Sequence, residues 1–375
     1  MELSRRTFIR LAAASPAAVA RDAIRARLPE GTPAGVAAIL ASTLAQEPSA
    51  INTDWFGTCL MKGLLDWAPR IPEVKAFGKR WLDFHLASGR VSPYSGNRSR
   101  PITAGGIHIT TYVGHFGLAM PCDQLFRMHQ DPRARRVAVE IADIILHKSA
   151  RNRFGMTAHD DTAAFAIPDT CYFVVEALSA AARLTGEPVY RDHALYQIRT
   201  YVDTFLDRKK GLAKTILFHE GIGKTYWTRA SGWLLWSITG VLRFLPPSHP
   251  EFQRLVADLQ LLAGGMARSQ DASGGLRVYL DDPASPLETT GAAMCATGLH
   301  ESVRRGWLPE SFRPVAARAW RHVTANLTED GDIRGVYTGW AVPAEQGKIE
   351  MDRVKMGWIP GFVLGAAAEM SGTAV

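Results

Sequence analysis

A glycine-marked turn recurs along this chain about every 60 residues, and helical sequence fills the intervals between the turns. The turns lie at Gly89, Gly155, Gly211, Gly274 and Gly331. Each interval has an apolar stretch with helical spacing, a short break containing Pro or Gly, and a second amphipathic stretch. Strictly alternating, strand-like runs are scarce, and the interval is too long for the commonest solenoid repeats. The pattern predicts an all-α chain of about six helical hairpins.

Four pairs of predicted helices follow this plan. They are 118–128 with 134–146, 171–184 with 189–206, 233–244 with 250–269, and 291–306 with 309–327. A ring of six hairpins, with inner helices covered by outer ones, is the (α/α)6 toroid, and a helical bundle or an open solenoid is the alternative. In a toroid, the turns at one end of the ring line a central cleft.

The composition excludes several classes of protein. Hydrophobic residues make up 47% and charged residues 21%, which is typical of a soluble globular protein, and no apolar run approaches the roughly 20 residues that span a bilayer. The net charge of +7 is spread along the chain without a basic face, so we expect no nucleic-acid partner. A mild positive field fits an anionic small substrate, and a solvated surface explains it almost as well. The four cysteines form no Cys-x-x-Cys pair, which argues against a zinc knuckle or a disulfide framework.

The first residues resemble a twin-arginine export signal. Arg5, Arg6 and Phe8 fall in register, a small-residue segment covers 11–20, and 18–20 is a plausible cleavage site. We therefore predict an export signal and linker over 1–30, a single catalytic domain over 31–375, and a periplasmic or secreted location. The alternative is the basic amphipathic start of a cytoplasmic protein.

The richest candidate site is the segment 219–233, which predicts a polar connection before an apolar helix over 234–245. It contains His219, Trp227, Arg229 and Trp233. Indole faces stack on the C–H faces of sugars, and a guanidinium holds a carboxylate through two parallel hydrogen bonds. The segment therefore predicts a pocket for an acidic sugar.

A second candidate is Asp169, directly before the predicted helix over 171–184. After Pro168 an aspartate is a natural N-cap, which is the structural interpretation. The functional interpretation is a carboxyl at the mouth of the ring, whose apolar setting raises its pKa and makes it a general acid. The neighbouring His-Asp-Asp at 159–161 could suggest metal ligands. Adjacent residues rarely point at one ion, so we predict a polar loop lip and no metal.

Several stretches together resemble glycoside hydrolase families 88 and 105, the unsaturated uronyl hydrolases. The segment 227–233 is similar to the family's Trp-x-Arg-Gly-Asn-Gly-Trp turn, and 219–221 to the His-Gly pair before it. Asp169, ahead of the Thr-Gly-Glu at 185–187, matches the catalytic aspartate. The segments 287–294 and 356–362, the latter with Trp358, are similar to two later motifs. The resemblance covers most of the chain after Trp55.

The resemblance implies a six-hairpin toroid without a cofactor that removes a terminal 4,5-unsaturated uronate from lyase-generated oligosaccharides, here of the rhamnogalacturonan type. Asp169 would protonate the vinyl ether at C4 and then help water to add at C5. Arg229 would hold the uronate, Trp227 and Trp233 would wall the sugar, and His219 would bond a hydroxyl or water. Two rivals stay open, which are a sugar epimerase working through paired histidines and a non-catalytic protein that binds acidic sugars.

Two departures from the family pattern affect the expected site. Ala230 and Ser231 replace a glycine and an asparagine beside Arg229. A second aspartate that the family usually carries upstream is missing from 107–115. Either His108 or His115 substitutes for it, or the subsite takes a different sugar, or activity is weakened. Nothing in these residues predicts the oligomeric state.

Overall fold

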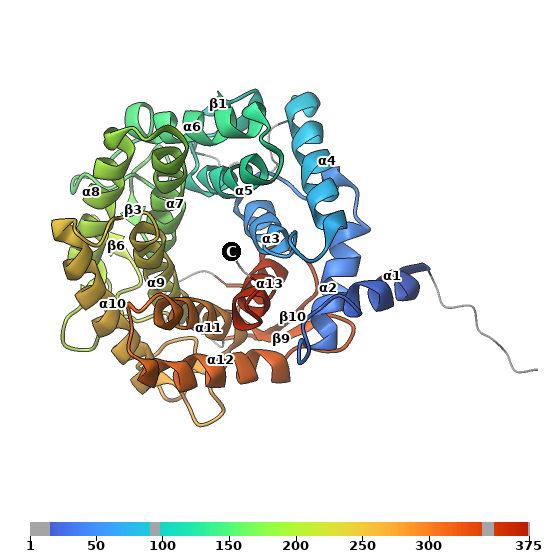
Figure 1. Ribbon diagram of the computed structural model, residues 1–375. Coiled ribbons are helices and arrows are strands. Elements are labelled where there is room, and N and C mark those ends of the chain that lie inside the picture. Colours follow the sequence, from blue (N-terminus) through green and yellow to red (C-terminus); the bar gives the residue numbers. More distant parts are fainter. Residues whose placement is uncertain (1–15, 91–97, 340–348, 374–375) are drawn as a thin grey trace, which may run out of the picture.

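Two concentric rings of helices make up the protein in a computed structural model that describes residues 16–90, 98–339 and 349–373 (Figure 1). The inner ring consists of α3 (Trp55–Leu65), α5 (Ala119–His129), α7 (Pro168–Thr185), α9 (Thr228–Leu242), α11 (Thr289–Arg304) and α13 (Trp358–Met370). The outer ring consists of α2 (Ala34–Leu44), α4 (Pro72–Ser88), α6 (Pro132–His147), α8 (Pro188–Phe205), α10 (Pro250–Ser269) and α12 (Arg313–Ala325). Helix α13 packs against α3 and closes the ring, so the predicted (α/α)6 toroid is confirmed.

Short two-stranded ladders tie the loops between helices, and they form no sheet layer of their own. All five pairs are antiparallel. They are β1 (Pro101–Ala104) with β2 (Ile107–Thr110), β3 (Phe165–Ala166) with β6 (Leu217–Phe218), β4 (Leu206–Asp207) with β5 (Leu212–Ala213), β7 (Leu276–Arg277) with β8 (Leu287–Glu288), and β9 (Ile333–Val336) with β10 (Asp352–Val354). Three short 3-10 helices complete the described elements, η1 (Pro48–Ala50), η2 (Val113–Leu118) and η3 (Glu310–Phe312).

Proline and glycine set the helix ends where the sequence predicts them. Proline, whose fixed φ suits the first turn of a helix, occupies that turn in several of the described helices, among them α4, α6, α7, α8, α10 and α12. Gly89 and Gly186 end α4 and α7 in the left-handed conformation that glycine adopts without strain. Every residue of α9 is buried, because the inner helix is covered by the ring on one side and by α8, α10 and their loops on the other.

The predicted starts of the two helices that carry the candidate residues were wrong. Helix α9 begins at Thr228, so the end of the predicted polar connection, including Arg229 and Trp233, lies in helix. Helix α7 begins at Pro168 with Ile167 as its N-cap, so Asp169 is the second helical residue and not the cap. In both cases the candidate residues lie near the start of an inner helix and not in the loop before it.

The predicted twin-arginine motif lies outside the described residues, and export stays a prediction. Residues 16–25 of the predicted signal and linker form α1 (Pro16–Arg25), which packs against α2 and buries Ile24. None of the helices in the described ranges combines the length and the apolar character needed to cross a bilayer.

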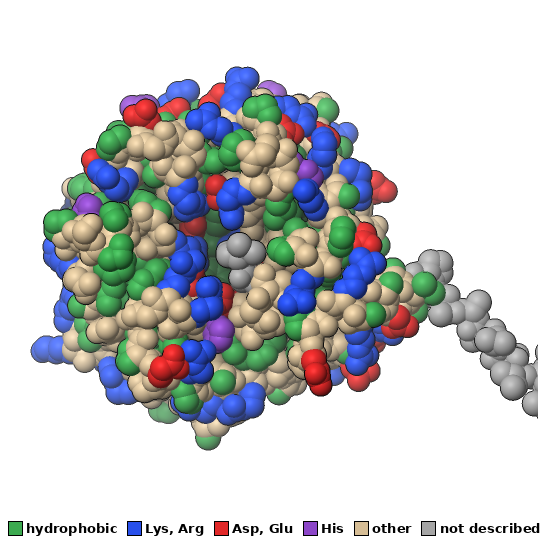
Figure 2. Space-filling model, viewed as in Figure 1, with side chains coloured by type: hydrophobic (Ala, Val, Ile, Leu, Met, Phe, Trp, Pro, Cys, Tyr) green, Lys and Arg blue, Asp and Glu red, His purple; other side chains and the backbone are tan. Residues whose placement is uncertain are grey.

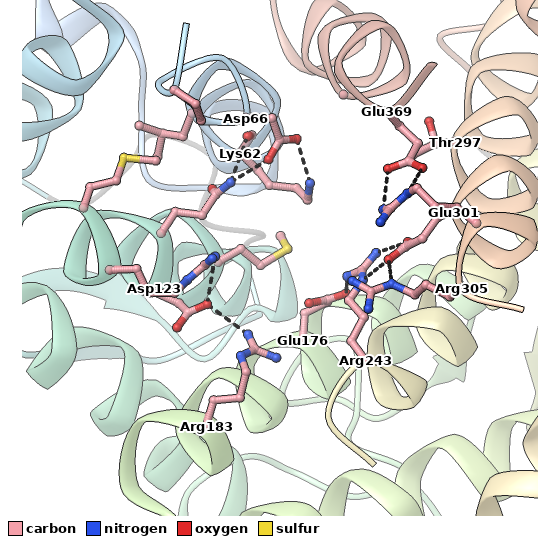
Figure 3. A pocket seen from close by; sticks show the side chains of 18 residues that line it. Lys62, Asp66, Asp123, Glu176, Arg183, Arg243, Thr297, Glu301, Arg305 and Glu369 are labelled. Carbon is pink, nitrogen blue, oxygen red and sulfur yellow. Dashed lines mark hydrogen bonds and ion pairs between the residues drawn. The ribbon is translucent and has the colours of Figure 1, made fainter. Parts of the chain in front are cut away.

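The six inner helices all run in the same direction. Their C-terminal turns meet around a hollow of about 290 Å³ on the face shown in Figure 2, where basic and acidic side chains gather. Arg243 bonds Glu176 at 3.0 Å and Glu301 at 2.7 Å, and Arg183 bonds Asp123 at 2.9 Å (Figure 3). Burial alone would raise the pKa of Glu301, but Arg243 outweighs it and lowers that pKa to about 2. The cations at this end offset the negative ends of the helix dipoles.

Ring closure depends on two glycines that let α3 and α13 approach closely. A Cβ on Gly63 would lie 2.1 Å from the carbonyl oxygen of Gly361, and a Cβ on Gly361 would lie 2.3 Å from the carbonyl oxygen of Cys59. Such distances leave no room for a methyl group between the two backbones.

We therefore expect Gly361→Ala to lower the free energy of unfolding by about 1–3 kcal/mol, the usual cost of overpacking. Gly365→Ala on the same helix is the control, because its Cβ would have its nearest neighbour at 3.7 Å. The control should be neutral or more stable by up to about 1 kcal/mol from helix propensity. Urea denaturation of both variants measures the difference, and equal effects would contradict this account of ring closure.

Candidate active site

The N-terminal turns of α3, α7, α9 and α13 surround a second hollow, at the end of the ring opposite the charged network. Its volume of about 440 Å³ falls within the roughly 300–1,000 Å³ typical of ligand pockets. Five of the residues singled out from sequence line it together: Asp169, Trp227, Arg229, Trp233 and Trp358. Residues nearly 190 positions apart in the chain therefore share one site.

Asp169 lies on the first turn of α7, and 20% of its side-chain surface stays exposed. Burial raises its pKa to about 7, against the opposing influence of hydrogen bonds from Thr170 and the charge of Arg229. A carboxyl with a pKa near neutrality can both give and take a proton at neutral pH. The physical requirement for a general acid and base is therefore met at this position.

A neutral histidine lies beside this carboxyl. His159 Nδ1 is 3.0 Å from Thr170 Oγ1 and 3.9 Å from Asp169 Oδ1. The ring packs edge-on against Tyr112, with centroids 5.2 Å apart. Burial lowers the pKa of His159 to about 4, so the ring is uncharged at neutral pH. Thr170 therefore contacts both the histidine and the carboxyl, and it helps to fix their relative position.

Arg229 is a buried cation held between aromatic rings. Its guanidinium carbon lies 4.0 Å from the Trp227 ring centroid and 5.1 Å from that of Trp358. It donates hydrogen bonds to the carbonyl oxygens of Tyr337 and Gly339, the latter at 2.9 Å. Burial lowers its pKa to about 10, so it stays charged at neutral pH. A stacked, desolvated guanidinium beside a hollow is suited to hold a carboxylate.

Glu288 supports this arrangement from behind. Its carboxylate is fully buried, caps α11 by accepting from Gly291 N at 2.6 Å, and lies 3.8 Å from Arg229 Nη1. The carboxylate thus partly balances the buried guanidinium without lining the hollow. In the sequence, this segment stands out only through its similarity to a family motif.

The three histidines proposed from sequence do not line the hollow, and these site assignments are corrected. His108 and His219 are exposed. Along β2, Ile107 and Ile109 point inward, so strand alternation turns His108 outward. His115 is fully buried, and its Nδ1 lies 3.0 Å from Thr110 Oγ1. Neither His108 nor His115 therefore replaces the missing aspartate in the hollow.

Ser231 also lies away from the hollow. It is fully buried, and its hydroxyl accepts a hydrogen bond from Ala213 N at 3.0 Å. The serine that replaces the asparagine of the family motif therefore connects α9 to β5 and does not line the pocket.

Sequence reasoning missed several residues that do line the site: Trp55, Phe56, Tyr112, Thr338 and Met356. Asp54 offers one signal, since it caps α3 by accepting from Phe56 N at 2.9 Å and so places two aromatic residues on an inner N-terminal turn. His159 and Asp160, predicted as a polar lip, do line the hollow. Among the residues that the structure describes, no group of three or more His, Cys, Asp or Glu side chains is placed to hold a metal ion.

Solved structures share this architecture. A possible member of the GH105 family from Klebsiella pneumoniae superposes with a TM-score of 0.74 at 20% identity, covering 85% of this chain and 82% of that one. A possible GH105 member from Salmonella enterica gives a TM-score of 0.75 at 18% identity, covering 99% and 96%. At these identities the likeness shows the fold, which is the helical toroid of this group.

Sequence comparison shows a glycoside hydrolase. The model of Glycosyl Hydrolase Family 88 matches residues 56–373, and the chain belongs to that family. An unsaturated rhamnogalacturonyl hydrolase of Bacillus subtilis, YesR, is 26% identical over 78% of this chain and 81% of its own length. An unsaturated 3S-rhamnoglycuronyl hydrolase of an Alteromonas strain is 23% identical over 45% of this chain and 43% of its own.

The raised pKa of Asp169 predicts a pH-dependent stability penalty. Between about pH 4, where an unfolded aspartate titrates, and about pH 7, the folded protein keeps a proton that the unfolded chain has released. Stability is therefore lost as pH rises through this window. Asp169→Asn should raise the free energy of unfolding at pH 8 by an amount on the order of 2–4 kcal/mol, and by almost nothing near pH 4.

Asp207 provides a control of opposite sign. Its hydrogen bond from Tyr226 lowers its pKa to about 2, so its contribution is present at neutral pH and lost in acid. Asp207→Asn should therefore lower stability at neutral pH. Urea titrations at several pH values measure both variants, and a gain for Asp169→Asn that does not change with pH would count against the assigned pKa.

Proposed function

We propose that this glycoside hydrolase removes a terminal 4,5-unsaturated uronate from lyase-generated oligosaccharides of the rhamnogalacturonan type. One observation carries the proposal: Asp169, with a pKa near neutrality, shares a hollow with the buried and stacked Arg229. Hydration of an unsaturated uronate needs two groups. One is a side chain that acts as both acid and base, and the other is a cation that binds the carboxylate. The relatives named above act on unsaturated rhamnogalacturonyl and rhamnoglycuronyl substrates, which supports the same substrate class.

In the proposed reaction, protonated Asp169 delivers its proton to C4 of the C4=C5 double bond. Positive charge then develops at C5 and is shared with the ring oxygen. Water adds to C5, and its proton passes to the Asp169 carboxylate, which restores the acid. The resulting hemiketal opens by breaking the bond between C5 and the ring oxygen, leaving a ketone at C5. The hemiacetal formed at C1 then collapses to an aldehyde and releases the remaining sugar as an alcohol.

The other pocket residues bind and orient the sugar in this proposal. Arg229 pairs with the uronate carboxylate, and Trp227, Trp233 and Trp358 form walls for the ring. The N-terminal turns of four inner helices face the same hollow, and their positive dipole ends favour an anion there. His159, uncharged at neutral pH, contacts Asp169 through Thr170 and leaves the carboxyl free to change its charge.

Asp169→Asn should abolish hydrolysis. An amide of the same shape cannot donate or accept the proton, and general acid–base catalysis contributes about 10²–10⁴-fold in rate. The test follows the ultraviolet absorbance of the conjugated uronate in an unsaturated disaccharide, which disappears on hydration. If the wild-type protein binds the disaccharide but the absorbance never falls, the non-catalytic binding protein is the correct interpretation.

Arg229→Met should weaken productive uronate binding by roughly 2–5 kcal/mol, the usual cost of removing one partner of a buried charge pair. Arg229→Lys is the matched control, because it keeps the charge and loses the planar fork, so its loss should be smaller. Steady-state kinetics of both variants with the same disaccharide measure the effect. An unchanged kcat/KM in Arg229→Met would remove the assigned role.

A further inference from the structure

The hydroxyl of Thr170 lies between two titratable groups of the candidate active site. Thr170 Oγ1 is 3.4 Å from Asp169 Oδ1 and 3.0 Å from His159 Nδ1. The histidine nitrogen and the carboxyl oxygen are 3.9 Å apart, which is too far for a hydrogen bond of their own. Thr170 is fully buried near the start of α7, so bulk water does not reach its hydroxyl. The threonine is therefore the connection between the two groups.

This hydroxyl carries one proton and cannot donate to both neighbours at once. A carboxylate at Asp169 only accepts, so Thr170 donates to it and is left to accept a hydrogen bond from His159 Nδ1–H. A protonated Asp169 is itself a donor, so Thr170 accepts from it and donates to an unprotonated His159 Nδ1. The two arrangements require different tautomers of a neutral imidazole.

His159 meets the requirements for the outer end of such a chain. Burial lowers its pKa to about 4 against the charge of Asp160, so at neutral pH the ring has one donor and one acceptor nitrogen. The rings of Tyr112 and Phe165, with centroids 5.2 Å and 5.0 Å from its own, hold it in place. It lines the hollow with 13% of its side-chain surface exposed. The ring can therefore exchange a proton with water there and change its tautomer.

The other ionisable groups that interact with Asp169 in the described parts of the chain keep their charge near neutral pH. They are Arg229 of α9, Cys59 of α3 and Tyr201 of α8. Burial lowers the pKa of Arg229 only to about 10, and it raises the pKa of Cys59 and of Tyr201 well above the usual values. The Tyr201 hydroxyl, which also contacts Thr170, donates its proton to a backbone carbonyl at 3.4 Å. A titration near pH 7 in this cluster therefore belongs to Asp169.

We propose that Thr170 and His159 form a reversible chain of hydrogen bonds that follows the proton on Asp169. In the carboxylate state the chain runs from His159 Nδ1–H through Thr170 to Asp169 Oδ1, and in the acid state it runs in the opposite direction. The buried carboxyl then keeps a partner in both states, which suits an acid that becomes a base within one reaction. This use in catalysis rests on the proposed function, whereas the chain itself does not. Thr170 and His159 are thus positioning residues that act through Asp169.

The tautomer of His159 is the direct readout, because ¹⁵N NMR shifts distinguish a protonated Nδ1 from a protonated Nε2. We expect the ring to pass from the Nε2–H form to the Nδ1–H form as pH rises, with a midpoint near the Asp169 pKa of about 7 and without becoming charged. Asp169→Asn and Thr170→Val should each abolish this change, while Thr170→Ser keeps a hydroxyl and should retain it. The signal that is missing in His159→Phe assigns the resonances.

Thr239→Val is the matched control for the loss of a hydroxyl. Thr239 is also fully buried on an inner helix, and it donates to a carbonyl oxygen of its own helix at 3.1 Å. This variant should keep the tautomer change of the wild type. Thermal unfolding of all the variants establishes which of them keep the fold.

Activity gives a second readout under the proposed function. Thr170→Val removes a hydrogen bond to the carboxylate, so the pKa of Asp169 should rise and the alkaline limb of the kcat/KM profile should move up by about one pH unit. Thr170→Ser should return the limb to its wild-type position. His159→Phe should move the limb in the same direction by less, and His159→Asn, which offers an amide N–H, should reverse part of that shift. A merely structural role would lower kcat/KM without moving the limb.

A His159 tautomer that stays the same across this pH range in the wild type would overturn the chain, and so would a change that persists in Thr170→Val. If Thr170→Val does not fold, Asp169→Asn decides, because a tautomer change that survives without a titrating carboxyl also contradicts the proposal. If the tautomer changes as expected but the wild type consumes no unsaturated disaccharide, the proposed function fails and the chain stands. If the disaccharide is consumed and the tautomer is fixed, the chain fails and the proposed function stands.

Discussion

The shared direction of the six inner helices is the constraint on which the rest of the structure depends. Because they run parallel, their positive dipole ends converge at one end of the ring and their negative ends at the other. The protein uses the two ends differently. Basic side chains and the carboxylates that pair with them gather where the helices finish (Figure 3), while the candidate site occupies the end where they start. At that end a helix start would favour the charged form of Asp169, and burial outweighs it. A proton donor can therefore work beside groups that attract anions.

The fold was predictable because its signals are local. Recurring glycine turns, prolines at helix starts and apolar spacing are all visible without knowledge of the ring. The start of α9 was not, because it is fixed by partners distant in sequence: Thr228 N donates to the carbonyl oxygen of Val278 at 2.9 Å, and Trp227 bridges to Tyr279. These contacts position residues that read as polar loop when only neighbours are considered. Helix boundaries at a functional end are set by tertiary structure.

The pocket residues that could be predicted are those whose side-chain chemistry by itself suits a site for an acidic sugar. Asp169, Arg229 and the tryptophans met that condition. The histidines did not, since the direction of each ring depends on strand alternation, as for His108, or on a local partner, as for His115. His159 was predicted only as part of a polar lip. It lies beside Asp169 because its ring forms a hydrogen bond with Thr170 of α7, a contact that the sequence does not reveal. A sequence shows which groups exist, whereas three-dimensional contacts decide which of them face the pocket.

The hydrogen bonds that hold Arg229 to the carbonyl oxygens of Tyr337 and Gly339 have a consequence for the environments in which the protein can work. A guanidinium on an open surface carries its own water and counterions, and dissolved salt weakens its hold on any anion. In the folded protein, backbone carbonyl groups and indole faces surround the Arg229 guanidinium in place of water. An arriving carboxylate meets a cation that mobile ions reach poorly. Under the proposed function, we therefore expect the binding of an acidic sugar to depend little on the salt concentration.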